Sequence, residues 1–156
     1  MAVGENAGAR PISVMDAALD EAKIAQTLGE VPIGAVITHQ GSIIARAGNR
    51  TRTLNDPTAH AEILAIRMAC EALGSQRIGE CDLYVTLEPC AMCAGAISHA
   101  RIRRLYYGAS DAKGGAIGHG PKFFGQPTCL HAPEVYAGIG ERDASEILRA
   151  FFKGLR

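Results

Sequence analysis

The sequence predicts a three-layer αβα protein in which helices cover both faces of a mixed sheet. Segments with strand character at residues 31–38, 43–47, 83–87 and 104–107 alternate with segments of helical spacing, which is typical of α/β proteins. The last two of these strands flank a helix, so we expect them to be parallel neighbours joined by a right-handed crossover. The turn at residues 39–42 joins the first two strands and predicts an antiparallel hairpin.

The first two helices have start and stop signals in the sequence. Apolar residues at helical spacing follow Ser13, and the pattern ends near Gly29. Asp56 and Pro57 predict the start of the second helix, because a capping side chain followed by Pro favours a first turn. Gly74 is expected to end that helix.

The C-terminal part of the chain predicts two more helices and a short strand. One helix is expected over residues 90–99, and a capping box from Asp143 to Glu146 predicts the start of a final amphipathic helix. A short last strand is expected at residues 134–136. The Gly-rich stretch 108–132 has little periodicity, and loops of that length in compact domains are usually functional or mobile.

The chain length and composition indicate one globular domain. Its 156 residues are 47% apolar and 21% charged, which excludes a largely disordered chain. We expect residues 1–12 to be a disordered tail and residues 13–156 to be a single domain. No apolar run reaches the ~18–20 residues of a membrane helix, and the N-terminus lacks the pattern of a secretory signal. We therefore expect a cytoplasmic protein without membrane contact.

The charge of the chain is balanced in total but not along its length. A net charge of zero argues against a general binder of polyanions. Residues 1–98 hold 7 Lys and Arg against 11 Asp and Glu, whereas residues 99–156 hold 9 against 5. This asymmetry is either chance scatter over a solvated surface or a basic face for nucleic acid; the sequence leaves both interpretations open.

Two short segments predict a metal site: His60-Ala-Glu62 and Pro89-Cys-Ala-Met-Cys93. Thiolate and imidazole are the protein donors that zinc prefers, and cysteines three apart on a helix lie on one face. We therefore expect one Zn²⁺ per chain, bound by His60, Cys90 and Cys93. Three protein ligands leave a fourth position for water, which is the arrangement of a catalytic zinc site.

Glu62 is the candidate catalytic residue. Both segments are expected to begin helices, so the metal would lie beyond two helix ends whose partial positive charge favours thiolate. At a first helical turn, His60 can bind the metal while Glu62 faces the bound water. Zinc lowers the pKa of such a water to roughly 7, and a neighbouring carboxylate can accept its proton and pass it on.

Each of these signals has an ordinary structural alternative when it stands alone. His60 could be a common first-turn histidine and Glu62 a solvated helix residue. The two cysteines could form a redox pair or half of a zinc finger, completed by His60 with His99 or Cys129. Together, however, the segments match H-x-E…P-C-x-x-C, the signature of zinc-dependent nucleobase deaminases.

Longer stretches extend this match. They are Val31-Pro-Ile-Gly-Ala-Val36, Gly48-Asn49-Arg50, Thr58-Ala-His-Ala-Glu62, Leu83-Tyr-Val-Thr-Leu-Glu-Pro-Cys90, Met92-Cys-Ala-Gly-Ala96, Arg101-Ile102, Gly108-Ala109 and Asp111-Ala-Lys113. With them the chain closely resembles the bacterial tRNA-specific adenosine deaminases, within the cytidine deaminase-like superfamily, from about residue 14 to residue 153. The resemblance implies a five-stranded sheet between helices, a homodimer, and conversion of adenosine to inosine at the wobble position of a tRNA anticodon.

The resemblance also implies a set of substrate-binding residues. Asn49 would hydrogen-bond the target base, the backbone N–H of Ala61 would bind its edge, and Asp111 would contact the nucleotide backbone. Ile33 and Phe151 would help to wall the pocket. Asn49 alone could instead be a turn residue that tolerates a left-handed backbone. The chain departs from the family pattern mainly in the loop at residues 114–131, where His119 and His131 are either surface histidines or phosphate contacts.

The chain could also have a different substrate or no catalytic activity. It could deaminate free bases or nucleosides, such as guanine or cytosine, with the same zinc and the same Glu62. It could also be a zinc-stabilised domain that docks RNA without chemistry. The C-terminal helix, with Arg149, Lys153 and Arg156 near its phenylalanines, favours recognition of a tRNA anticodon stem-loop through its flanking nucleotides.

Overall fold

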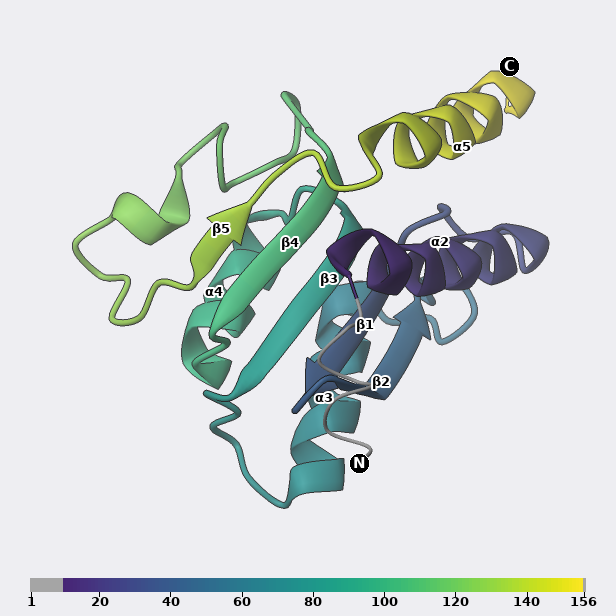
Figure 1. Cartoon of the computed structure of the whole chain (residues 1–156). Coiled ribbons are helices and arrows are strands. Elements are labelled where there is room, and N and C mark those ends of the chain that lie inside the picture. Colours follow the sequence, from purple (N-terminus) through teal and green to yellow (C-terminus); the bar gives the residue numbers. More distant parts are fainter. Residues whose placement is uncertain (1–9, 156) are drawn as a thin grey trace.

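The computed structural model describes residues 10–155, which form one mixed five-stranded sheet between two layers of helices (Figure 1). The strands lie in the order β2-β1-β3-β4-β5. Their bounds are Gly34–His39 (β1), Ser42–Gly48 (β2), Cys81–Leu87 (β3), Arg104–Ala109 (β4) and Glu134–Tyr136 (β5). This confirms the predicted three-layer αβα fold.

The strand directions also agree with the sequence. β1 runs antiparallel to both β2 and β3, whereas β3, β4 and β5 are parallel to one another. The hairpin turn between β1 and β2 has Gln40 at φ 53° and Gly41 at φ 80°. Two successive residues with positive φ are typical of the tight hairpin turn whose twist matches that of the strands.

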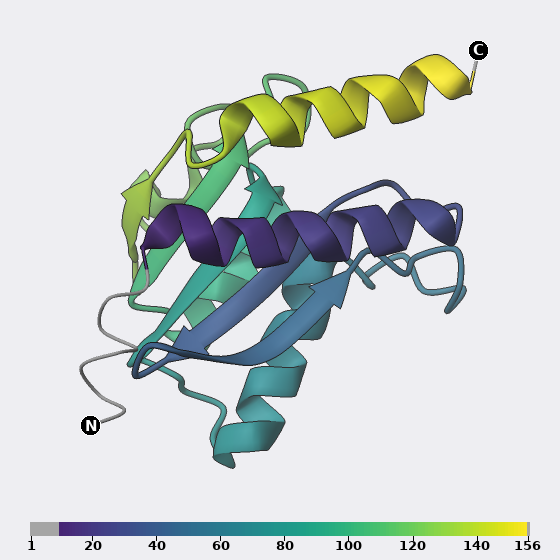
Figure 2. The ribbon, with the colours of Figure 1, turned by 45° about the vertical axis from the view of Figure 1, so that its right-hand side comes forward.

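Two helices cover each face of the sheet. Their bounds are Pro11–Thr27 (α2), Ala61–Leu73 (α3), Ala91–Ala100 (α4) and Glu141–Gly154 (α5), with a short 3₁₀ turn, η1, at Phe123–Gly125. Figure 2 shows α2 lying across the strands with α5 beside it, and α5 extends beyond the sheet. Strand alternation explains the layers: Val36 and Tyr84 pack on the side of α2, whereas Ala35 and Leu83 pack in the core on the side of α3 and α4.

The close approach of α2 to β1 depends on a glycine. A Cβ atom at Gly34 would lie 2.6 Å from the backbone nitrogen of Ala22 and would also collide with the carbonyl oxygen of Ala18. The absence of a side chain therefore lets the helix backbone rest directly on the strand. The backbone N–H of Gly34 donates to the hydroxyl of Thr86, 3.1 Å away, which ties β1 to β3 at the same level.

Three predicted helix starts were wrong. The first helix begins at Pro11, not after Ser13, so residues 11 and 12 belong to the helix and not to the predicted tail. Residues 1–9 of that tail lie outside the described residues. The carboxylate of Asp56 accepts hydrogen bonds from the backbone N–H (2.8 Å) and hydroxyl (2.7 Å) of Thr58. It closes a local turn, so α3 starts only at Ala61.

The predicted capping box at the start of the last helix is also absent. The helix α5 starts at Glu141 after Gly140, whose φ is 71°, and no side chain caps it. Asp143 therefore lies inside the first turn, where its negative charge favours the positive end of the helix dipole.

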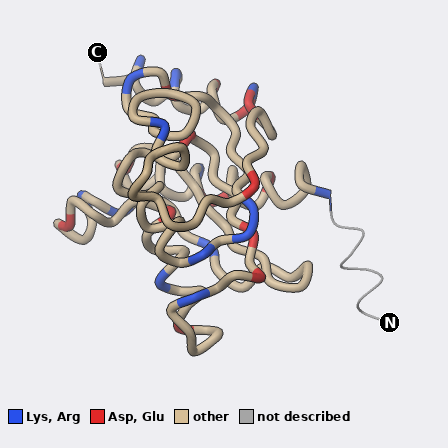
Figure 3. The backbone as a smooth tube through the Cα atoms, turned by 90° about the vertical axis from the view of Figure 1, so that its left-hand side faces the viewer, with Lys and Arg blue, Asp and Glu red and all other residues tan. Residues whose placement is uncertain are grey.

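The basic residues of the C-terminal half do not form one continuous face. Figure 3 shows Lys and Arg on several separate segments, including the end of α5 near the C-terminus. Arg103 binds Asp82 with two hydrogen bonds of 3.0 and 3.1 Å, and Arg104 lies 3.6 Å from both Asp82 and Glu134. These pairs occupy the charges of Arg103 and Arg104, so a basic face for nucleic acid would have to be formed by other residues. No helix within residues 10–155 is long and apolar enough to span a membrane.

Candidate active site

The start of α3 and the start of α4 meet at one point beside the sheet. His60 is the N-cap of α3 and Cys90 is the N-cap of α4, both with extended backbone at ψ 152° and ψ 177°. Cys93 lies one turn into α4. Neither side chain makes a capping hydrogen bond to its helix, and both donor atoms lie in the same small group with Cys93. The prediction that both segments begin helices is confirmed.

The donor atoms of this group are spaced for zinc. The Nδ1 atom of His60 lies 3.6 Å from the Sγ atom of Cys90 and 3.5 Å from that of Cys93. All three donor atoms lie within 4.8 Å of one another. Tetrahedral zinc, with bonds of about 2.3 Å to sulfur and 2.0–2.1 Å to nitrogen, separates such a pair by about 3.5 Å. The three residues therefore fit a zinc ion without rearrangement.

The group has three protein ligands and not four. Within residues 10–155, it is the only cluster of at least three His, Cys, Asp or Glu side chains that could hold a metal. Neither His99 nor Cys129 joins it; the Sγ atom of Cys129 lies instead 3.1 Å from the carbonyl oxygen of His131. The zinc-finger alternative is therefore wrong, and one position of a tetrahedral ion remains for a non-protein ligand.

The hydrogen bond between the two thiols shifts their pKa values in opposite directions. A hydrogen bond with Cys93 lowers the pKa of Cys90 to about 4. The same bond, with burial, raises the pKa of Cys93, and the bond with Cys90 raises the pKa of His60. Cys90 is therefore the thiolate and Cys93 the thiol. Zinc binding must displace the Cys93 proton, since both sulfurs bind zinc as thiolates.

Glu62 lies in the first turn of α3, next to these donors but outside their group. It is buried, with 4% of its surface exposed, and burial raises its pKa to about 6. A carboxylate whose pKa lies near neutrality can both accept and release protons at physiological pH. Glu62, the predicted catalytic residue, thus lies beside the three metal donors.

Asn49 and Ala61, predicted to bind the base separately, bind each other. The side-chain oxygen of Asn49 accepts the backbone N–H of Ala61 at 3.0 Å, so Asn49 caps α3. Its backbone does not have positive φ, which makes the alternative of a left-handed turn residue wrong. The amide NH₂ of Asn49 remains a possible donor to a substrate, whereas the Ala61 N–H is already engaged.

Of the other predicted substrate residues, Asp111 lines a groove between α5 and the loop after β4, whereas Ile33 and Phe151 are not among its lining residues. Asp111, Lys113, Leu148 and Phe152 are among the residues that line this groove of about 660 Å³. Phe152 is among its lining residues, whereas Phe151 packs against Phe152 with ring centroids 5.3 Å apart. Ile33 packs at the margin of the core on the side of α3 and α4. Their substrate contacts stay predictions.

Two buried glutamates hold the loops around the site, and neither was assigned a role from the sequence. Glu30 accepts hydrogen bonds from the backbone of Arg52 (3.2 Å) and from both the backbone and the hydroxyl of Thr53 (2.6 Å each). Glu88 accepts hydrogen bonds from the loop after β4, including one of 2.8 Å with the ring of His119. Only the position of Glu88 directly before Pro89-Cys90 marked it in the sequence.

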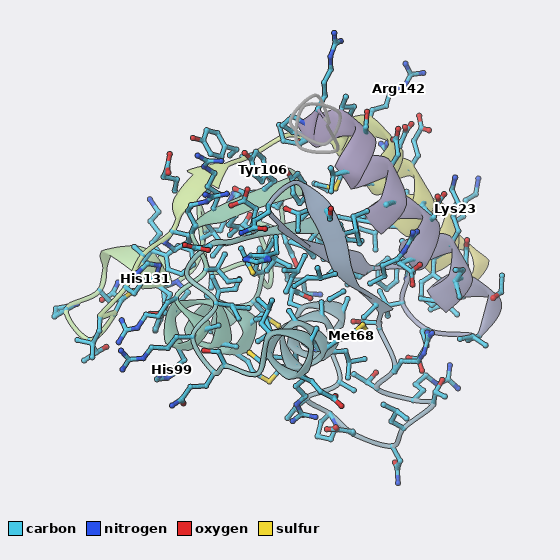
Figure 4. All side chains as sticks on the ribbon, turned by 60° about the horizontal axis from the view of Figure 1, so that its bottom comes forward. Lys23, Met68, His99, Tyr106, His131 and Arg142 are labelled. Atoms are coloured by element: carbon cyan, nitrogen blue, oxygen red, sulfur yellow. The ribbon has the colours of Figure 1, made fainter. Side chains whose placement is uncertain are left out.

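The two histidines of the Gly-rich loop differ in their surroundings. His119 faces the Glu88 carboxylate. The Nε2 atom of His131 lies 2.8 Å from the carbonyl oxygen of Ile102. Figure 4 shows His131 and His99 on the same side of the molecule, away from Lys23 and Arg142. Both loop histidines therefore already have partners within the protein.

The fold and the His-Cys-Cys centre with its buried glutamate define a zinc-dependent deaminase. The chain belongs to the cytidine and deoxycytidylate deaminase family, whose zinc-binding region matches residues 10–109. It is 65% identical to a tRNA-specific adenosine deaminase of Agrobacterium fabrum over 142 residues, which cover 91% of this chain and 93% of the relative.

Solved structures of deaminases are also similar to this chain. A tRNA:A34 deaminase, studied for A-to-I editing at the wobble position of transfer RNA, superimposes with a TM-score of 0.85 and 66% identity. The match covers 86% of this chain and 97% of that one. A guanine deaminase from Bacillus subtilis is 45% identical, with a TM-score of 0.59, but the match covers only 62% of each chain.

Replacing Cys93 with Ser should remove most of the zinc. A hydroxyl is a poor zinc ligand, and even changes outside the ligand set cost about 10–100-fold in affinity, so we expect a loss of more than about 100-fold. Metal analysis of the purified protein, with urea unfolding beside it, measures this. Cys129→Ser is the matched control, and it should keep one zinc per chain. Full zinc content in Cys93→Ser would show that the ligand assignment is wrong.

Proposed function

We propose that this protein is a zinc-dependent hydrolase that converts adenosine to inosine at the wobble position of a tRNA anticodon. The observation that carries the proposal is the spacing of His60, Cys90 and Cys93 for zinc, with the buried Glu62 beside them. The relatives named for this reaction match about nine-tenths of the chain, including 91% for the Agrobacterium fabrum enzyme, which supports the choice of substrate.

Zinc held by His60, Cys90 and Cys93 would lower the pKa of a water ligand from about 15.7 to about 7. The ionised carboxylate of Glu62 accepts a proton from that water and later delivers it to the departing amine. Water thereby replaces the exocyclic amine of adenine, with ammonia as the second product. Because Glu62 is shielded from solvent, the proton that it accepts is transferred to the substrate and is not lost to bulk water.

Substrate recognition is proposed to use the groove beside α5. The amide NH₂ of Asn49 would donate to the target base, and Ile33 and Phe151 would help to wall its pocket. The backbone N–H of Ala61 would contribute through its hydrogen bond to Asn49, which fixes that amide. Asp111 and Lys113, on the groove wall, would contact the flanking nucleotides. An anticodon loop already presents splayed bases, so little unstacking is needed.

The alternative substrates are free bases or nucleosides such as guanine or cytosine. The partial match to a guanine deaminase supports this alternative, but the match leaves more than a third of each chain uncovered. An assay panel separates the two: inosine formed in an anticodon stem-loop supports the tRNA reaction, and ammonia released from a free base supports the alternative. A zinc-stabilised RNA-binding domain without activity would give neither product.

We further propose that the chain from α2 onward acts as one catalytic domain in the cytoplasm, where tRNA is modified, and that the chain is a homodimer. Apolar side chains on the outer side of α3 and α4 support a dimer, since Met68, Leu73 and Met92 are exposed. Analytical ultracentrifugation should give twice the chain mass of 16.4 kDa; a mass that stays at one chain at assay concentrations would contradict the dimer.

Glu62→Gln should keep zinc and lose turnover. The amide cannot accept the water proton, and groups in this role typically contribute ~10²–10⁴-fold to the rate. Zinc content and initial rates on an anticodon stem-loop test this together. Glu71→Gln, an exposed position on the same helix, is the control and should keep normal rates. If Glu62→Gln lost its zinc, Glu62 would be a ligand and not a proton carrier.

Binding of the stem-loop should weaken steeply with added salt, because phosphate contacts release counterions. Arg149 and Lys153 are exposed on α5 beside Phe152, whereas Arg156 lies outside the described residues. Replacing Arg149 and Lys153 with Ala should reduce the slope of log affinity against log salt by about 1.4, at about 0.7 for each contact. The control pair Lys23→Ala and Arg77→Ala removes equal charge elsewhere. Equal slopes in both pairs would exclude α5 as the phosphate contact.

A further inference from the structure

The carboxylate of Glu88 is the centre from which the loop after β4 is held. Its side chain is fully buried, at 0% exposed. One oxygen accepts the backbone N–H of Asp111 at 3.0 Å and lies 2.8 Å from the Nδ1 atom of His119. The other oxygen accepts the backbone N–H groups of Ile117 (3.1 Å) and Gly118 (3.0 Å). Both ends of the loop at residues 111–118 are therefore fixed to one side chain.

A glycine in the same loop independently shows how closely the loop wraps this carboxylate. A Cβ atom at Gly115 would lie 2.5 Å from the Oε2 atom of Glu88 and 2.5 Å from the carbonyl oxygen of Asp111. Any larger residue at this position would push the loop away. Next to it, the backbone N–H of Ala116 donates to the carbonyl oxygen of Pro89 at 2.9 Å. The loop is thus closed around the Glu88-Pro89 segment.

The Glu88-Pro89 segment is followed in the chain by the metal ligand Cys90, and residues of the loop line the groove beside α5. Cys90 follows Pro89 in the chain. On the other side, Asp111 and Lys113 line the groove opposite Leu148 and Phe152 of α5. The carboxylate of Asp111 is held in turn by the backbone N–H groups of Lys113 (3.1 Å) and Gly114 (2.9 Å). Glu88 is therefore the shared support of the metal centre and of one groove wall.

We propose that Glu88 is the positioning residue for the RNA substrate: it sets the distance between the zinc centre and the loop that contacts the nucleotides flanking the target adenosine. This inference rests on the proposed tRNA function and adds the residue that aligns the two parts of its site. Glu88 is not proposed as a catalytic residue, because its carboxylate is fully buried and its oxygens are occupied by hydrogen bonds from the loop. Its effect is transmitted through Asp111 and Lys113.

A glutamine at position 88 would preserve size but not the hydrogen bonds. Its NH₂ group cannot accept, so the donors to one of the two oxygens lose their partner. A buried carboxylate in β3, the strand that Glu88 directly follows, provides the matched control. Asp82 lies near the opposite end of β3, where it pairs with Arg103 and Arg104 and contacts neither the loop nor the groove. Asp82→Asn therefore reports the general cost of losing such a group.

The experiment compares wild type, Glu88→Gln, Gly115→Ala and Asp82→Asn, each with its zinc, on an anticodon stem-loop. The loss of a hydrogen bond to a charged group changes an equilibrium constant by about 10-fold or more. We expect Glu88→Gln and Gly115→Ala each to raise KM about 10-fold, with kcat changed less than about 3-fold and zinc at one per chain. Amide hydrogen exchange at residues 111–118 should become at least about 10-fold faster. Asp82→Asn should lower thermal stability but leave KM within about 2-fold.

Each outcome decides between the explanations. If wild type forms no inosine in the stem-loop, the proposed function is wrong and this inference is overturned with it. If wild type is active but KM and exchange are unchanged in Glu88→Gln, the positioning role alone is overturned. Should Glu88→Gln lose zinc or fail to fold, Gly115→Ala decides, since it leaves the carboxylate intact. A fall in kcat and zinc content without a rise in KM in Gly115→Ala would also overturn the proposal.

Discussion

His60, Cys90 and Cys93 must reach one point from two different helices, and this requirement fixes where α3 and α4 begin. A ligand in mid-helix would point along one side of its helix, whereas an N-cap residue points past the helix end. The two N-caps therefore converge, with their donor atoms 3.6 Å apart, and Cys93 in the first turn of α4 lies 3.5 Å from His60. Because the caps are committed to metal, α3 receives its capping hydrogen bond from Asn49 on the other side of the site.

Glu30, Glu62 and Glu88 are all buried, and their hydrogen bonds give them different properties. Burial alone would raise the pKa of each. In Glu30 and Glu88, hydrogen bonds from the surrounding loops outweigh burial and hold the pKa below its ordinary value, so both stay ionised and act as fixed acceptors. In Glu62 burial dominates and raises the pKa to about 6. The same side chain thus is held ionised at two positions, whereas at the third its pKa suits the proton transfer proposed for Glu62.

The sequence predicted the features that depend on neighbouring residues. Short segments of strand character between turn and helix signals located all five strands, and the spacing of His60, Glu62, Cys90 and Cys93 identified the metal donors and the carboxylate beside them. The errors arose where one local pattern serves two purposes. Asp56 followed by Pro57 is a signal for a helix start and also for a turn, and here it makes the turn.

Contacts between distant parts of the chain had no sequence signal. The partners of Glu88 lie 23 to 31 residues away, and no pattern within the Gly-rich loop points to them. The need for glycine at position 115 is explained only when the loop is seen against that carboxylate. Likewise, the bond between Asn49 and Ala61 spans 12 residues and became visible only in the folded chain.

The helix α5 contributes little to the core. Within the described part of the chain, its only buried residues are Ala144 and Leu148, so the part of α5 after Leu148 lies outside the core. Phe152, Arg149 and Lys153 nevertheless shape the groove and its border. Mutations at these exposed positions can accumulate at small cost to folding, while the metal centre beneath stays unchanged. If the groove binds substrate as proposed, such substitutions would change which nucleic acid or base is accepted without altering the His60, Cys90 and Cys93 centre, and relatives with different substrates would share that centre.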